Sequence, residues 1–316
     1  MLLPMRHRTC HLRLRFAGLL SPVSRKRLLL ITVSASPGVM GDADRGAGAV
    51  WSHRCGWEDF LVPVSAAGGR RGLGLDGDWV SRWTVTWRSG RSEQCCSVRD
   101  LVREPSLRSD PIRGFSWKRD QGHRPGLTFM VSTGRHHGAE SMEEARVLLA
   151  LDFAANVTDV VSQPFRLRFD AARQRVHTPD FLVETPGATW LLDVRPEPLI
   201  EDKDLESFAA AAEMALACGW HYRIAAGWRE NAWAALDAFS SQRRRLPDPL
   251  GLRPGLLAAA RQRQATFGEL AAASGCEPVA RAQLLHLLWH RRIGVDLSLP
   301  LADSSPVACS DSGDLQ

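Results

Sequence analysis

The sequence predicts a mixed α/β domain over residues 140–246, followed by a small α+β domain over residues 247–304. Its 316 residues suffice for two modest domains, and a hydrophobic fraction of 44% is ordinary for a globular chain. Helical and alternating apolar patterns follow one another in the order α-β-β-β-α-β in the first region. The proline-rich turn at residues 246–251 separates that region from three further helical segments.

Residues 1–72 are predicted to form a basic, disordered extension, because they show no sustained period of 2 or 3.6. They hold eleven Arg or Lys against four Asp or Glu, so the remaining chain is slightly acidic. An arm that contacts a DNA backbone fits this excess, and a solvated tail is the favoured alternative. Residues 305–316 are predicted to be a second disordered tail.

Cysteine usage and hydropathy bear on the compartment. Seven cysteines, an odd number without C-x-x-C spacing, argue against a disulfide framework or a zinc site, so we expect a reducing cytoplasm. No apolar run approaches the roughly 18 residues of a membrane span. Residues 28–33 are too short for the apolar core that we expect of a signal peptide.

Residues 73–139 are predicted to pack against the α/β domain. The stretch Trp79–Trp87 alternates apolar and polar residues, and the turn Ser89-Gly90 leads to a second run ending at Val98, which is typical of a β-hairpin. We expect its tryptophans in a core rather than stacked on bases. The polar segment 111–138 is predicted to be a connection whose cations either contact phosphate or are simply solvated.

The α/β domain is predicted from seven segments, each with its own period. Helices are expected where apolar residues recur on one face, and strands where they alternate or form a short apolar run. In chain order these are the helix 141–153, strands 165–169, 176–184 and 189–194, the helix 204–218, the strand 222–226 and the helix 230–245.

The C-terminal domain is predicted to be winged-helix-like or helix-turn-helix. Its expected elements are a helix over 256–262, a helix from the capping box Thr266–Glu269 to Ser274, a helix over 278–292 and a strand over 294–299. Cationic or titratable side chains could line a recognition helix, namely Arg281, His286, His290, Arg291 and Arg292. A protein-docking surface is the alternative.

Three acidic residues from different elements form a candidate catalytic site. Asp180 and Asp193 lie on successive strands that a tight turn can bring together, and Glu144 comes from the preceding helix. Magnesium takes hard oxygen ligands and keeps several waters, so two or three carboxylates with the backbone carbonyl of Val194 can hold it. A bound Mg²⁺ lowers the pKa of water and neutralises the charge that grows on a phosphate under attack. Arg195 shares a strand face with Asp193, so it could hold that phosphate.

Structural roles also fit these residues. Asp180 could be a turn residue after Pro179, and Asp193 could pair with Arg195 at a strand end. Asp193, however, ends the apolar run 190–192, where a charge without a partner is costly.

Taken together, the motifs resemble those of TnsA-like endonuclease subunits of heteromeric transposases. The resemblance covers residues 75–304. It is carried by Gln163-Pro164-Phe165, Pro179-Asp180-Phe181, Asp193-Val194-Arg195-Pro196, residues 219–223, residues 133–136 leading into Glu140-Ser141, Asp152-Phe153, residues 287–290 and residues 295–297.

The resemblance implies a restriction-endonuclease-like core of the PD-(D/E)xK type, with Glu144, Asp180 and Asp193 as ligands of Mg²⁺, for which Mn²⁺ can substitute. It implies hydrolysis at the 5′ ends of a mobile element on double-stranded DNA, in the nucleoid of a prokaryote. It also implies two partners, a DDE transposase subunit and an AAA+ ATPase that binds the C-terminal domain.

Arg195 stands where the family motif has lysine. Arginine has a pKa above about 12 and cannot act as a base, although it can stabilise the charge of a phosphate. Lysine occurs only three times in this chain, so the exchange fits its composition. Two other functions therefore stay open: a stand-alone restriction or defence nuclease, and a catalytically silent DNA-binding or assembly subunit.

Overall fold

The computed structural model describes residues 48–101, 110–114, 125–154, 156–170, 174–262 and 265–309. Residues from Ala49 onward belong to one compact unit. Most cations of the predicted basic extension precede residue 48 and so lie outside the described residues. In the described ranges, no helix is long and apolar enough to cross a lipid bilayer.

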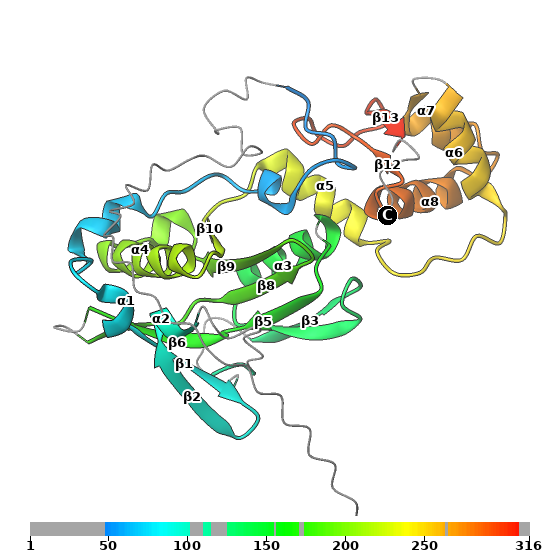
Figure 1. The fold of residues 1–316 in the computed structure, drawn as a ribbon. Coiled ribbons are helices and arrows are strands. Elements are labelled where there is room, and N and C mark those ends of the chain that lie inside the picture. Colours follow the sequence, from blue (N-terminus) through cyan, green and yellow to red (C-terminus); the bar gives the residue numbers. More distant parts are fainter. Residues whose placement is uncertain are drawn as a thin grey trace, which may run out of the picture. The chain divides into compact units, whose positions relative to one another are not determined.

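A four-stranded sheet with helices on its two faces forms the centre of the α/β domain (Figure 1). The strand order is β10-β9-β8-β5, in which only the β9–β10 pair is parallel. Neighbouring side chains on β9 point to opposite faces. Leu192 packs with Leu148 of α3, whereas Leu191 packs with Ala211 of α4. The bounds are α3 (Met142–Ala154), β5 (Asp159–Ser162), β8 (Phe181–Thr185), β9 (Ala188–Val194), α4 (Asp202–Ala217) and β10 (His221–Ala225).

The first strand of this core is β5, and not the predicted strand 165–169, which is corrected here. Phe165–Phe169 forms β6, which belongs to a second sheet of order β2-β1-β6-β7. Phe165, Leu167 and Phe169 are fully buried between that sheet and α4. The sequence signal of β5 is weak because the strand has only four residues. The element order α-β-β-β-α-β is nevertheless present as α3-β5-β8-β9-α4-β10.

The predicted strand 176–184 is divided at Pro179. Proline lacks the N–H that a ladder needs. The part before it is β7 (Arg175–His177), which pairs with β6, and the part after it is β8, which pairs with β9 and β5. Asp180 therefore lies where the chain passes from one sheet to the other.

The predicted hairpin is present, but it begins five residues later than its pattern. Trp79–Arg82 forms the short helix α1, and the hairpin comprises β1 (Thr84–Ser89) and β2 (Ser92–Ser97), followed by α2 (Val98–Leu101). Trp83 is 1% exposed and packs edge-on against Phe169. This confirms the core role expected for the tryptophans.

A second hairpin was not predicted. Within the expected polar connection, β3 (Gly126–Met130) pairs with β4 (Arg135–Ala139). Of the residues in these two strands, Met130 and Ala139 belong to the core cluster around α3. So few buried apolar residues give no alternating pattern in the sequence. The connection's cations Lys118, Arg119 and Arg124 lie outside the described residues.

The prediction of disorder is wrong for residues 48–72, which pack against both domains. Two 3₁₀ helices, η1 (Trp57–Phe60) and η2 (Ala67–Gly72), lie there, and Phe60 and Leu61 are buried. Val62 donates its N–H to Gly227, and Val50 accepts one from Leu297. Buried aromatic anchors in irregular backbone leave no period in the sequence, so the pattern could not show this order.

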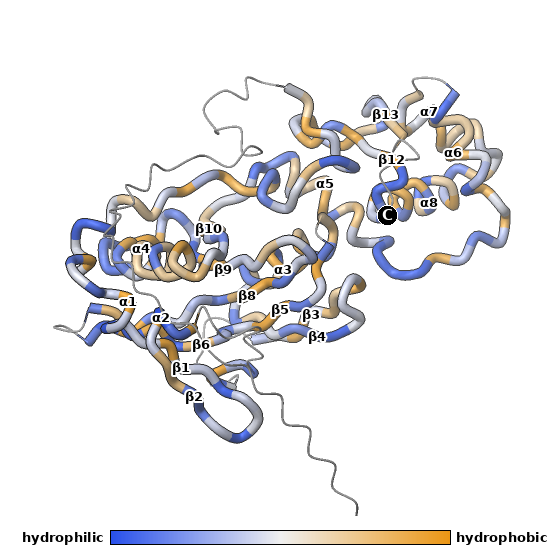
Figure 2. The backbone as a smooth tube through the Cα atoms, viewed as in Figure 1, coloured by the Kyte–Doolittle hydropathy of each residue, from blue (hydrophilic) through white to orange (hydrophobic). Residues whose placement is uncertain are grey.

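The C-terminal domain contains three helices and a three-stranded sheet of order β11-β13-β12 (Figure 1). Figure 2 shows the apolar colouring along α8. The preceding helix α5 (Glu230–Ser240) ends before its predicted end at Arg245. The bounds are α6 (Leu252–Gln262), β11 (Ala265–Thr266), α7 (Phe267–Ala272), α8 (Glu277–Trp289), β12 (Ile293–Gly294) and β13 (Pro306–Cys309).

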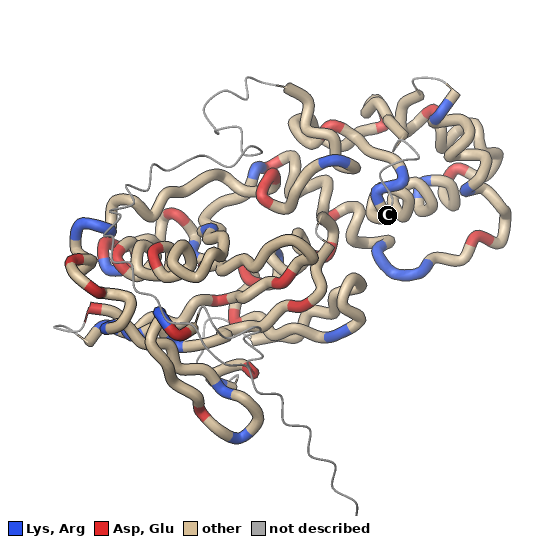
Figure 3. Tube along the Cα trace, viewed as in Figure 1, with Lys and Arg blue, Asp and Glu red and all other residues tan. Residues whose placement is uncertain are grey.

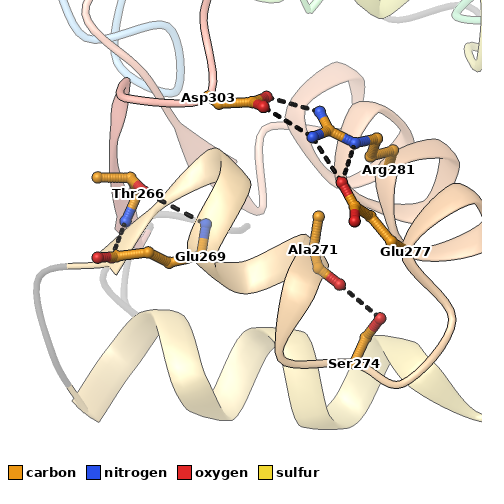
Figure 4. Close-up of polar contacts among 7 residues, drawn as sticks. All are labelled: Thr266, Glu269, Ala271, Ser274, Glu277, Arg281 and Asp303. Atoms are coloured by element: carbon orange, nitrogen blue, oxygen red, sulfur yellow. Dashed lines mark hydrogen bonds and ion pairs between the residues drawn. The ribbon is translucent and has the colours of Figure 1, made fainter.

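Several predictions for this domain can be compared with the structure. The capping box of α7 is confirmed, because Thr266 Oγ1 accepts the N–H of Glu269 and Glu269 Oε2 accepts the N–H of Thr266 (Figure 4). The expected strand 294–299 is shorter, since β12 ends at Gly294. The expected tail contains β13, so disorder from residue 305 is wrong as far as Cys309. Resemblance to a winged helix stays a prediction.

Candidate active site

Asp180 and Asp193 lie side by side at one end of the β8–β9 pair. In the antiparallel register Phe181 is opposite Leu192. Asp180, which precedes Phe181, and Asp193, which follows Leu192, are therefore neighbours. Asp180 donates its N–H to the Leu192 carbonyl (3.0 Å), and its Oδ2 accepts the N–H of Val194 (2.7 Å). The prediction that a hairpin joins these two residues is confirmed.

Asp193 is held by two side chains from flanking strands. It is 1% exposed, and a buried carboxylate is costly without hydrogen bonds. The Tyr222 hydroxyl of β10 donates to its Oδ2 at 2.7 Å. Nε2 of His177, at the end of β7, lies 2.9 Å from Oδ1 and 3.0 Å from Oδ2. Burial and the adjacent Asp193 charge raise the pKa of Tyr222 well above its usual range, so the phenol stays a donor.

Asp180 has fewer compensating contacts than Asp193. Burial raises its pKa well above the usual range, and the charges of Asp193 and Glu144 raise it further. The hydrogen bond from Val194 acts in the opposite direction but is a smaller effect. A buried carboxylate beside two others is stabilised by a proton or a nearby cation.

Glu144 caps its own helix. It is 7% exposed and lies in the first turn of α3. Its Oε2 accepts the N–H of Glu140 (2.8 Å) and its Oε1 accepts from the Ser141 hydroxyl (3.0 Å). Burial raises the pKa of Glu144, although these two bonds oppose the effect. Its charge is one of the smaller causes that raise the pKa of Asp180, after burial and the charge of Asp193.

Arg195 is directed towards α4 rather than towards the carboxylates. Its Nε donates to the Leu199 carbonyl (3.1 Å), beyond β9 in η3 (Glu197–Leu199), and lies 3.4 Å from Asp204 Oδ2 in α4. Strand alternation predicted that the side chains of Arg195 and Asp193 leave the same face of one strand. However, β9 ends at Val194, so the alternation does not extend to Arg195. The backbone N–H of Val194 donates to the Asp180 carboxylate. A metal-binding role of the Val194 carbonyl stays a prediction.

The donor set of this site suits a hard divalent cation. It consists of carboxylate oxygens, and a bound cation would offset the burial and the neighbouring negative charges that raise the pKa of Asp180. In the part of the chain that the structure describes, however, no three His, Cys, Asp or Glu side chains are gathered closely enough to hold a metal. Protein donors occupy oxygens of all three carboxylates here, so binding requires some of these hydrogen bonds to be exchanged.

Sequence reasoning missed four residues of this site. His177 and Tyr222 hold Asp193, and Gln163 and Arg113 lie on the Glu144 side. Signals for two of them were present: Tyr222 is the only tyrosine of the chain, and Gln163 belongs to the motif Gln163-Pro164-Phe165. Arg113 gave no signal, because its segment has no regular period.

The predicted recognition helix does not present its cations as expected. Arg281 is bound by Glu277 and by Asp303, which hold its pKa above its usual range (Figure 4). Nδ1 of His286 lies 2.8 Å from the Gln242 carbonyl. Arg291 donates to the carbonyls of Ala154, His53 and Cys55. These three contacts are internal, whereas His290 and Arg292 are exposed, and whether the domain binds DNA or protein stays a prediction.

Comparison with known proteins assigns the central segment. Residues 154–226 match the family model described as TnsA-like endonuclease N terminal. The match runs from the end of α3 through β10, and it includes Asp180, Asp193 and Tyr222 but not Glu144. No curated protein matches the chain. Residues 154–226 are thus similar to a TnsA-like endonuclease N-terminal domain, as the motifs in this segment predicted.

Proposed function

We propose that the protein is the DNA-cleaving subunit of a TnsA-like heteromeric transposase. In this proposal it hydrolyses phosphodiester bonds at the 5′ ends of a mobile element, with Mg²⁺ or Mn²⁺. The observation that carries the proposal is the set of Asp180, Asp193 and Glu144, of which Asp193 and Glu144 are buried, within and just before the segment that matches a TnsA-like domain. Burial and the charges of Asp193 and Glu144 raise the pKa of Asp180, and a carboxylate perturbed in this way is typical of a functional site.

Each residue has a proposed role. Asp180, Asp193 and Glu144 would hold the metal, and the Val194 carbonyl could complete the set. When bound, the metal supplies an activated water and neutralises charge on the phosphate. His177 and Tyr222 fix the orientation of Asp193 by their hydrogen bonds. Arg195, tied to Asp204, would act on the phosphate only after leaving that contact.

The partners follow from the family. We propose double-stranded DNA at the element ends, a DDE transposase subunit and an AAA+ ATPase, within the nucleoid of a prokaryote. The internal contacts of Arg281 and Arg291 support an ATPase-docking role for residues 247–304 over a role in reading DNA sequence. Figure 3 shows basic residues in the segment linking α5 to α6, where Arg243–Arg245 offer a site for DNA backbone.

The test is nicking of a supercoiled plasmid that carries the element ends. The protein is assayed in Mg²⁺ and in Mn²⁺, alone and with its transposase and ATPase partners, beside Asp180→Ala. We expect nicking that needs the metal, is lost with EDTA and is absent in the variant. Nicking without any partner would favour the stand-alone nuclease instead.

One observation favours a second candidate, the silent assembly subunit. Arg195 stands at the position of the family's lysine and is tied to Asp204. If the wild-type protein with all partners is as inert as Asp180→Ala, the catalytic proposal fails and this second function becomes the better account.

A further inference from the structure

A second arginine, Arg113, contacts neighbours of the candidate site that Arg195 does not contact. Arg113 donates from Nε to Gln163 Oε1 (2.9 Å) and from one Nη to Glu140 Oε2 (2.8 Å). Its side chain is 58% exposed. Among the residues that the structure describes, Gln163 and Glu140 take up two of the five N–H donors of the guanidinium.

Both anchors of Arg113 are bonded to residues of the candidate site. Gln163 donates its N–H to the Asp180 carbonyl (2.7 Å), and Glu140 donates its N–H to Glu144 Oε2 (2.8 Å). The guanidinium is also close enough to lower the pKa of Glu144 in part. Arg113 is therefore linked, through one intermediate residue each, to the carboxylate of Glu144 and to the backbone carbonyl of Asp180.

Gln163, one of the two residues that hold Arg113, has an unusual conformation. Gln163 is 1% exposed and holds a left-handed backbone with φ of 49°. Such a conformation is strained for a residue other than glycine, and its persistence at a site suggests a role there. The side-chain Nε2 of Gln163 is buried without a hydrogen-bond partner, while its Oε1 is turned to Arg113. The amide is oriented for the arginine at the expense of its own donor.

Arg195 differs from Arg113 in its partners. Its Nε contacts the Leu199 carbonyl and lies 3.4 Å from Asp204 in α4. Both arginine side chains are partly exposed and both lie in an ion pair, since Arg113 pairs with Glu140 at 2.8 Å. What distinguishes Arg113 is that its two partners are themselves hydrogen-bonded to Asp180 and Glu144.

We propose that Arg113 is the guanidinium that contacts the DNA phosphate at this site. An arginine fork matches two oxygens of a phosphate and stabilises charge that grows on it during hydrolysis. The inference rests on the proposed nuclease function and adds a substrate-contacting residue to it.

The experiment compares four variants of the full chain: Arg113→Ala, Arg113→Lys, Arg195→Ala and the control Arg99→Ala. Arg99 is a matched control because it is 52% exposed and pairs with one carboxylate, that of Asp78. Thermal melting first establishes that each variant is folded. The first readout is plasmid nicking with the partner proteins in Mg²⁺.

We expect Arg113→Ala to lower the nicking rate by about 100-fold, the scale for losing one donor to transition-state charge. Arg113→Lys keeps the charge but loses the fork, so we expect a loss of about 10-fold. Arg99→Ala should stay within about twofold of wild type. Nicking by Arg113→Ala at the wild-type rate, or a larger loss in Arg195→Ala, would overturn the inference.

The second readout is DNA binding, which does not depend on turnover. Fluorescence anisotropy of an element-end duplex is measured in Ca²⁺ over a range of salt concentrations. Loss of one phosphate contact should weaken binding by Arg113→Ala and lower the salt slope by about one, relative to Arg99→Ala. An unchanged slope contradicts the inference whether or not the wild type nicks DNA. An inert wild type, by contrast, contradicts the proposed nuclease function and leaves the binding result to test the inference.

Discussion

In the C-terminal domain Arg281 meets two carboxylates and Arg291 donates to three backbone carbonyls, whereas Asp180 at the start of β8 faces two further carboxylates. Both regions contain charged side chains that are held in fixed contacts. In the C-terminal domain each arginine contacts oxygen atoms that compensate its positive charge. At the candidate site the negative charges of Asp193 and Glu144 add to the effect of burial on Asp180. Paired charges of the first kind are typical of structural contacts, whereas an incompletely compensated carboxylate such as Asp180 is typical of a functional site.

The largest effect is expected from Glu144→Gln, which tests the carboxylate that lies outside the matched family segment. The glutamine amide oxygen can still accept the Glu140 N–H, and its NH2 group can donate to the Ser141 hydroxyl, so the variant should fold, but it removes a proposed metal ligand. We expect the nicking rate to fall by at least about 100-fold. The control is Glu143→Gln, whose carboxylate contacts Arg146 and Trp228. Equal activity of the two variants would remove Glu144 from the site.

Arg291→Ala should affect stability and not chemistry. The side chain joins the carbonyls of Ala154, His53 and Cys55, and Arg291 ends α8 with a left-handed φ of 55°. Losing these donors should lower the free energy of unfolding by about 3 kcal/mol. Urea denaturation measures this change, with the exposed neighbour Arg292→Ala as the control.

If both arginine variants prove equally stable, the C-terminal domain does not depend on satisfied charge, and the comparison fails on that side. A folded Arg291→Ala that no longer nicks DNA would also contradict it, because Arg291 would then belong to the chemistry.

Tyr222→Phe should have a smaller effect, because it removes one of two side-chain partners of Asp193 and keeps the packing. The hydroxyl lies 2.7 Å from Oδ2, and His177 continues to hold the carboxylate. Loss of a group that orients a metal ligand lowers metal affinity or activity by about 10-fold or more. Titration with Mn²⁺, followed by calorimetry, checks the affinity. A variant that binds and nicks like wild type would reduce Tyr222 to a packing residue.

The predictable part of the fold and site depended on local spacing. Asp180 and Asp193 could be paired because a short turn between two strands fixes their neighbourhood whatever else surrounds them. The capping box of α7 was likewise readable, since its four residues contain the whole interaction. Sequence alone also carried the family motifs, and the match confirms the resemblance for those that lie within residues 154–226.

The rest depended on partners far away in the sequence. Whether Phe165–Phe169 joins one sheet or another is decided by pairing with β1, some eighty residues earlier, which its alternation cannot encode. The direction of Arg195 is decided by Asp204 and by the packing of α4. His177 and Arg113 became visible only when β7 and residues 110–114 were placed beside the carboxylates.

The most direct test of the comparison is the free energy of unfolding of wild type and Asp180→Asn against pH, in EDTA. The folded pKa of Asp180 is raised above its unfolded value of about 3.9, so the folded state binds the extra proton. By linkage, stability is highest below the unfolded pKa and is lost as pH rises through the folded pKa.

The account predicts that wild type loses stability over this range relative to Asp180→Asn, so that at neutral pH the variant is at least as stable. A variant that is less stable at neutral pH, with the same slope as wild type, would show that Asp180 is a satisfied structural charge and contradict the account.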